Sequence, residues 1–177
     1  FFGVYPITVN LHREVVVVVV QFGAPYGMGL VAGSKCELHA VLAMDTGRGA
    51  PIICNGYKDQ DYVRLALMGQ KLGKSVFLVV EKPGELPLIL RVAREQGVEP
   101  QIGIRIKLVA PGSGKWEESG GDYSKFGLTA PELIEAVEAL KAEASLERFK
   151  LVHFHIGSQI PNIRHVKDAL REMARYF

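Results

Sequence analysis

The sequence predicts an α/β fold built on a parallel sheet. Short runs rich in β-branched residues recur along the 177 residues, and segments with helical spacing of apolar side chains separate them. Strands that alternate with helices in this way pair in parallel. A chain of this length is expected to form one domain with a sizeable apolar core. The expected strands are residues 4–9, 29–32, 51–54, 75–80, 102–108 and 150–156.

The connection between the first two strands carries conflicting signals. Residues 15–20 are all valine, and β-branched residues favour a strand. The alternation of units requires a helix at this place, so we expect a helix. A strand would instead precede Gly27-x-Gly29-x-x-Ala32, a loose match to the dinucleotide fingerprint, and would make the chain an open nucleotide-binding domain. That fingerprint needs its first glycine directly after the strand, so we expect these glycines to begin the second strand.

Two later helices have clear start signals. Ser34 precedes Glu37 by three residues, and Thr129 precedes Glu132 by three, so both pairs fit the capping box. Behind each cap, apolar residues recur with helical spacing and predict a face that covers the sheet. The residues expected on these faces are Leu38, Val41 and Leu42 in the first helix, and Leu133, Ile134, Val137 and Leu140 in the second.

Composition and charge exclude several classes of partner. Apolar residues make up 48% of the chain and charged residues 23%, as in ordinary globular proteins. The net charge of +2 creates no strong field for nucleic acid or an anionic membrane. The longest apolar run is also far shorter than the about 20 residues that span a bilayer. We therefore expect neither a nucleic-acid partner nor a membrane span.

Cysteine usage and the chain ends give two further expectations. Cys36 and Cys54 are too few for a disulfide framework and lie in apolar stretches, which predicts a reducing, cytoplasmic compartment. The chain begins with Phe1 and stops at Phe177 inside an amphipathic helical pattern without a C-cap. We therefore expect it to be a fragment of a longer protein.

Polar residues with chemical potential gather where the sixth strand ends. His153 and His155 share one face of a period-two strand, and Gly157 and Ser158 follow. These residue types can contact an anion or a ring. They can equally be histidines packed with hydrogen-bonding partners in the sheet. A metal site would need further ligands, which the sequence does not place.

Arg105 lies in the fifth strand between Ile104 and Ile106 and points to the opposite face from both. A buried arginine needs a partner. An anionic ligand is one candidate, and a carboxylate on a neighbouring strand such as Glu81 is the other. The spacing does not separate them.

Several segments resemble the biosynthetic arginine decarboxylases, in the same order and over the whole chain. They are VYPITVN (residues 4–10), AGSKCEL (32–38), ICNGYKD (53–59), GSGKW (112–116), SGG (119–121), SKFGL (124–128) and HFHIGSQ (153–159). The resemblance implies an alanine-racemase-like fold, a partial (β/α)8 TIM barrel of which this chain holds the first six βα units. Residues 1–177 would then be an incomplete pyridoxal-phosphate-binding domain, without the last two strands and the family's C-terminal β domain.

The resemblance also implies an activity. That family is a set of pyridoxal-phosphate-dependent carboxy-lyases that convert arginine to agmatine and CO2, a step toward the polyamines. By resemblance, His155 would stack on the pyridine ring, Ser158 would bind the phosphate and Arg105 would lie beside the ring. Mg2+ is a further cofactor that the resemblance allows, and the full-length protein would be a homo-oligomer.

Two residues depart from the family pattern. The first strand of the family reads Tyr-Pro-Ile-Lys-Val-Asn, and its lysine forms a Schiff base with the cofactor, whereas this chain has Thr8 there. A hydroxyl cannot form that bond. Val31 replaces a glutamate in the second strand. We therefore expect this fragment to be inactive as an enzyme, and a non-catalytic module that binds pyridoxal phosphate or a partner chain is the alternative.

Overall fold

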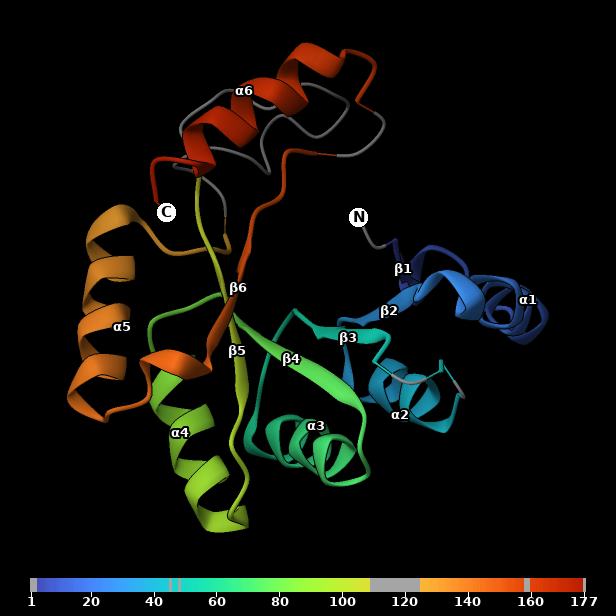
Figure 1. Ribbon diagram of the computed structural model, residues 1–177, viewed down its shortest axis with the longest axis horizontal. Coiled ribbons are helices and arrows are strands. Elements are labelled where there is room, and N and C mark those ends of the chain that lie inside the picture. Colours follow the sequence, from blue (N-terminus) through green and yellow to red (C-terminus); the bar gives the residue numbers. More distant parts are fainter. Residues whose placement is uncertain (1–2, 45, 48, 109–124, 158–159, 177) are drawn as a thin grey trace. The chain divides into compact units, whose positions relative to one another are not determined.

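The computed structural model describes residues 3–44, 46–47, 49–108, 125–157 and 160–176. Its strands form one sheet whose spatial order, β1-β2-β3-β4-β5-β6, is the order of the sequence (Figure 1). The strands are Val4–Pro6 (β1), Gly29–Ala32 (β2), Pro51–Cys54 (β3), Ser75–Val80 (β4), Gln101–Arg105 (β5) and Phe149–His153 (β6). The α-helices are Arg13–Gly23 (α1), Lys35–Ala43 (α2), Gln60–Lys71 (α3), Glu85–Gln96 (α4), Ala130–Ala142 (α5) and Ile163–Met173 (α6).

The order and direction of the strands confirm the predicted fold class. The pairs β1–β2, β2–β3 and β3–β4 are parallel, and each strand is followed in the chain by a helix. In open nucleotide-binding sheets the strand order reverses at a switch point, where the ligand binds. The order here has no reversal among the described strands, which is the arrangement of a (β/α)8 barrel.

The described chain divides into two compact units. The first consists of Phe1–Val80, Gly84–Gly103 and Glu147–Leu151, and the second of Glu81–Pro83, Ile104–Leu146 and Val152–Phe177. The first unit holds α1 to α4 and most of the sheet. The second holds α5, α6 and the segments that directly follow β4, β5 and β6.

The core of the first unit lies along the central strands. In β4 the residues from Leu78 to Val80 are buried without a break, and Ile52 to Cys54 of β3 are too. Continuous burial is typical of a parallel sheet that is covered on both faces. The helices contribute apolar side chains to this core, among them Leu38 and Val41 of α2, Val63 and Leu67 of α3, and Ile89 of α4.

The valine run forms the helix α1, as expected from the alternation of units. Val16 and Val20 are buried and Val18, between them, is exposed, which is helical spacing. The alternative of a strand at residues 15–20, and with it the nucleotide-binding sheet, is wrong. A Cβ on Gly29 would lie 2.1 Å from the carbonyl oxygen of Pro51, so the start of β2 requires glycine.

Three of the expected strands extend too far at their carboxyl ends. β1 ends at Pro6 and passes into a 3-10 turn at Ile7–Val9, in which the amide of Asn10 donates to the Ile7 carbonyl at 3.2 Å. β5 ends at Arg105, not at residue 108, and β6 at His153, not at residue 156. β-branched residues continue past each end, but regular strand pairing does not: after β5, Ile106 makes only an isolated parallel bridge, to Leu128.

Both predicted helix caps are present. Ser34 Oγ accepts the amide of Glu37 at 3.3 Å, and the Glu37 carboxylate accepts the amide of Gly33 at 2.8 Å. In α5 the Glu132 carboxylate accepts the Thr129 amide at 2.7 Å and the Thr129 hydroxyl at 2.8 Å. The buried face of α5 is made by Leu133, Ala136 and Leu140.

The expectation that Ile134 belongs to the buried face of α5 is wrong, because Ile134 lies one helical step to the side and is 63% exposed. No helix in the described ranges is both long and apolar enough to cross a membrane.

Candidate functional site

An ion pair stands at the carboxyl ends of β4 and β5, within the second unit. Arg105 is the last residue of β5, and Glu81 directly follows β4. Arg105 Nη1 donates to Glu81 Oε1 at 2.7 Å, with the arginine side chain 13% exposed and the glutamate 1% exposed. The carboxylate partner that the sequence left as one of two candidates for Arg105 is therefore present in the structure.

The segment Lys125–Leu128 lies against this pair. The amide of Gly127 donates to the backbone carbonyl of Glu81 at 2.9 Å, and the amide of Leu128 donates to that of Arg105 at 2.7 Å. The Phe126 ring lies under two cations, with Arg105 Cζ 5.7 Å and Lys82 Nζ 5.6 Å from its centroid. These distances are within the range of cation–π attraction. Sequence reasoning assigned no role to Phe126, although it belongs to the SKFGL segment.

His155 lies two residues beyond the end of β6, also in the second unit, and its side chain is exposed. Partial desolvation by neighbouring protein atoms lowers the pKa of His155 below the ordinary histidine value, and the positive charge of Arg105 lowers it further. The negative charge of Glu81 acts in the opposite direction. The imidazole is therefore mostly neutral at pH 7 and presents an uncharged aromatic face.

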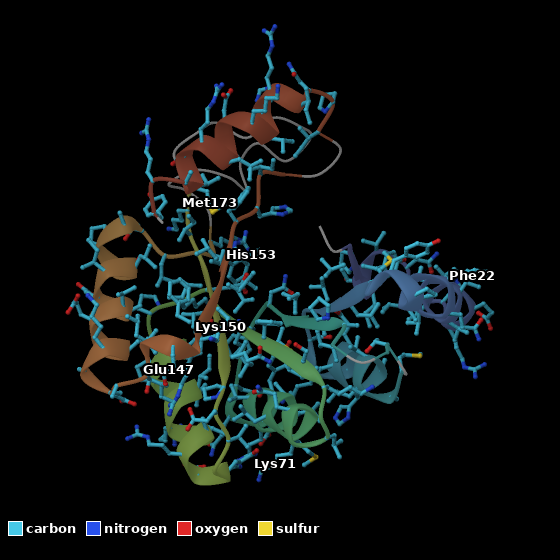
Figure 2. All side chains as sticks on the ribbon, in the orientation of Figure 1. Phe22, Lys71, Glu147, Lys150, His153 and Met173 are labelled. Atoms are coloured by element: carbon cyan, nitrogen blue, oxygen red, sulfur yellow. The ribbon has the colours of Figure 1, made fainter. Side chains whose placement is uncertain are left out.

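The two histidines do not share one strand face, because β6 stops between them. His153, labelled in Figure 2, is the last residue of β6. Its side chain is half-buried, and its backbone carbonyl accepts the amide of Ile106 at 2.9 Å. Gly157, which follows His155, has a φ of 108° and thus a backbone that favours glycine. Ser158 lies outside the described residues.

Thr8 belongs to the first unit. It is exposed on the 3-10 turn that follows β1, directly after the buried Ile7. Val31 lies in β2, is half-buried and pairs with Pro6 of β1. Thr8 and Val31, the two positions at which we expect a departure from the family pattern, therefore lie toward the carboxyl ends of β1 and β2. The structure groups Arg105 with Glu81 and His155 in the second unit, and Thr8 and Val31 belong to the first.

A turn after β3 is a further feature that the sequence analysis missed. Gly56 has a φ of 80°, and a Cβ there would lie 2.3 Å from the carbonyl oxygen of Gly33. Lys58, fully buried, donates to the Gly56 carbonyl at 2.7 Å and to Glu85 at 3.2 Å. The Asn-Gly pair of the NGYKD segment is a turn signal. Lysine is rarely buried without a specific partner, and Lys58 has two here.

The donor set in the second unit fits pyridoxal phosphate. A neutral imidazole offers a flat face for a pyridine ring, and a nearly buried guanidinium offers donors for an anionic oxygen. No group of three or more His, Cys, Asp or Glu residues within the described ranges is arranged to hold a metal ion.

Comparison with known proteins agrees with this chemistry. Residues 2–177 match the family model described as the pyridoxal-dependent decarboxylase, pyridoxal binding domain. The chain belongs to this family. It is 54% identical over 176 residues to the biosynthetic arginine decarboxylase of Bacteroides thetaiotaomicron, an alignment that covers 99% of this chain and 28% of the relative. The corresponding enzyme of Klebsiella pneumoniae is 49% identical over 177 residues, which are 100% of this chain and 28% of that protein.

Solved structures support the same fold. The biosynthetic arginine decarboxylase of Campylobacter jejuni superposes with a TM-score of 0.86 at 38% identity, over 98% of this chain and 28% of that one. Alanine racemase of Clostridium difficile, at 15% identity, gives a TM-score of 0.60 over 99% of this chain and 43% of that one, which shows the fold alone. The predicted alanine-racemase-like partial barrel is confirmed, as is the resemblance to the arginine decarboxylases. The chain spans 28% of the length of these curated relatives.

Proposed function

We propose that this chain is the first part of the pyridoxal-phosphate-binding barrel of a decarboxylase that converts arginine to agmatine and CO2. The supporting observation is the Glu81–Arg105 pair beside His155 at adjacent strand ends. It occurs in a chain 54% identical over nearly its whole length to an enzyme named biosynthetic arginine decarboxylase. Agmatine is a precursor of polyamines such as spermidine, so the whole protein would act in polyamine biosynthesis and arginine catabolism.

In this proposal His155 holds the cofactor ring by stacking, Ser158 binds its phosphate and Arg105 lies beside the ring. Support comes from the lowered pKa of His155, which favours the uncharged ring, and from the low exposure of the Arg105 guanidinium. When bound, pyridoxal phosphate supplies an electron-poor ring that takes up the electrons left by the departing carboxylate. Arg105 keeps a fixed positive charge near the ring, and His155 excludes water from the face it covers.

Because of Thr8, we propose that this chain does not catalyse the decarboxylation. The threonine side chain has no amine and cannot bond to the cofactor aldehyde, so binding would be reversible. Val31 supplies no carboxylate at the neighbouring strand. A non-catalytic module that binds pyridoxal phosphate or a partner chain is therefore the second candidate function, and Thr8 is the observation that favours it.

The remaining features of the whole protein follow from the family. We propose that residues 1–177 form an incomplete barrel domain and that two further strands and a C-terminal β domain complete the enzyme. The whole protein would be a homo-oligomer, in which the partner subunit completes the site. We propose a cytoplasmic location because Cys36 and Cys54 are free thiols. Magnesium stays an expectation that rests on the family resemblance alone.

The test of this proposal is a comparison of Thr8 with lysine at the same position. Purified chain is titrated with pyridoxal phosphate, treated with borohydride and analysed by peptide mass spectrometry. We expect reversible binding and no cofactor mass on the Thr8 peptide, whereas Thr8→Lys should retain the reduced cofactor at residue 8.

A matched control is Val9→Lys, because Val9 is 71% exposed on the same turn. This variant adds an amine one residue away and should retain much less cofactor than Thr8→Lys. Absence of any cofactor binding by the original chain would contradict the proposed function. Equal labelling of the two lysine variants would contradict the assignment of position 8.

A further inference from the structure

Glu81 holds two parts of the second unit at once. Its carboxylate accepts Arg105 Nη1 at 2.7 Å, and its backbone carbonyl accepts the amide of Gly127 at 2.9 Å. The side chain is 1% exposed, so solvent screens this interaction little. Position and burial together make Glu81 the residue that joins Arg105 to the segment 125–128 within the second unit.

Two contacts thereby fix the position of the Arg105 guanidinium. Glu81 binds its Nη1, and the Phe126 ring lies 5.7 Å from its Cζ. Phe126 is itself held in place because the adjacent Gly127 is bonded to Glu81 and the next residue, Leu128, to Arg105. A long side chain such as arginine loses much rotamer freedom when it is held in this way. The freedom is lost in the protein before any ligand binds, which favours ligand binding.

We propose that Glu81 is a positioning residue of the cofactor site, acting through Arg105. This inference rests on the proposed function, because it takes Arg105 as the residue beside the cofactor ring. Glu81 itself need not touch the cofactor. Its carboxylate fixes where the guanidinium charge stands, and its carbonyl fixes the aromatic side chain that packs on that charge.

A simple charge argument predicts the opposite effect of neutralising Glu81. Pyridoxal phosphate is an anion, so removal of a nearby negative charge should strengthen its binding if only the net field matters. If Glu81 instead positions Arg105, then Glu81→Gln should weaken binding, because a neutral amide is a poorer partner for the guanidinium. The sign of the change separates the two accounts.

The experiment is a double-mutant cycle on the 177-residue chain, read by the dissociation constant for pyridoxal phosphate from its absorbance and fluorescence. We expect Glu81→Gln and Arg105→Gln each to weaken binding by about tenfold or more, the scale of one hydrogen bond to a charged group. The double variant should bind no more weakly than Arg105→Gln alone. Glu135→Gln, which removes an exposed carboxylate from α5 in the same unit, is the control and should not change binding. Unchanged or tighter binding by Glu81→Gln, or additive losses in the double variant, would overturn the inference.

A second measurement needs no cofactor. In the 15N-labelled chain, the Arg105 Nη–H signals should exchange slowly with water, because Nη1 donates to Glu81. Glu81→Gln should speed this exchange several-fold, while Glu135→Gln should not. An unchanged Arg105 signal in Glu81→Gln overturns the inference. If the original chain fails to bind the cofactor, the proposed function fails, and the Arg105 signal still decides the role of Glu81. Should Glu81→Gln not fold, Glu81→Asp keeps the charge, shortens the reach and serves in both measurements.

Discussion

At the scale of single residues, the guanidinium of Arg105 donates to the carboxylate of Glu81 at 2.7 Å. Alternation with Ile104 and Ile106 correctly indicated a polar position that needs a partner. It could not choose between Glu81 and an anionic ligand, because period two defines the face of a side chain and not the atom that it meets. The guanidinium carries five N–H donors, so its bond to Glu81 and a contact with an anion are compatible.

The protonation of His155 gives a prediction at this scale. Arg105→Gln removes a positive charge that disfavours the imidazolium, so the pKa of His155 should rise toward its ordinary value. NMR titration of the His155 ring signals measures this. The direction of the change follows from the lowered pKa. In the original chain the His155 ring stays neutral down to a lower pH than in Arg105→Gln.

Arg171→Gln is the matched control for the His155 titration. It removes a guanidinium that is 78% exposed on α6 of the same unit and should leave the titration of His155 unchanged. A pKa of His155 that stays constant or falls in Arg105→Gln would show that Arg105 does not act on this ring.

At the scale of elements, the sequence predicted where helices and strands occur better than where strands end. The valine run became helical because the chain must cross from β1 back to the start of β2, and this tertiary requirement outweighs local β propensity. The ends of β1, β5 and β6 were misplaced because residues such as Ile7 and Val9 keep strand propensity after the pairing has ended. Thr8 and His155 accordingly lie on the segments that follow the strands.

The turn after β3 gives a prediction at the scale of elements. Gly56→Ala places a Cβ 2.3 Å from the Gly33 carbonyl oxygen and requires a non-glycine residue at a φ of 80°. Gly73→Ala imposes a similar backbone strain at a φ of 82°, but with no atom within 4 Å of the new Cβ. We expect Gly73→Ala to lower the free energy of unfolding by about 1 kcal/mol and Gly56→Ala by at least about 2 kcal/mol more. Urea denaturation measures both losses. Equal losses would mean that the turn relaxes to relieve the steric overlap at Gly56 without a further loss of stability.

At the scale of the whole molecule, the alternation of strands and helices predicted the parallel α/β class. It did not distinguish an open sheet from a barrel, because both have the same local pattern. The resemblance to arginine decarboxylases made that distinction, and the consecutive strand order agrees with it. Neither the alternation pattern nor the family resemblance predicted that the Phe126 ring contacts the Arg105 guanidinium. That contact depends on the tertiary fold, because the two residues lie in different segments of the chain.

An apolar surface on the first unit leads to a prediction for the whole molecule. Phe22, which Figure 2 labels, is 74% exposed and Tyr26 is 81% exposed. With Val18 they line an apolar hollow in the first unit, and the same unit holds β1, which ends the sheet. Surfaces of this kind and unpaired strand edges favour association. We expect the 177-residue chain to self-associate as its concentration rises, measured by light scattering, and Phe22→Lys to reduce this association.

Leu72→Lys is the control for that measurement. Leu72 is 72% exposed at the end of α3 in the same unit, so the variant makes the same change of charge and hydropathy at a different place. It should leave the association unchanged. A chain that stays monomeric at every concentration would contradict the prediction.

The exposed position of Thr8, directly beyond the buried Ile7, has an evolutionary consequence. A side chain that faces outward on a turn contributes little to folding, so selection for a foldable protein does not preserve the chemistry there. A gene can thus lose its reactive amine and still encode the ancestral scaffold. Overall likeness to a working enzyme would then persist after turnover had stopped, as we propose for a chain with Thr8 at this position.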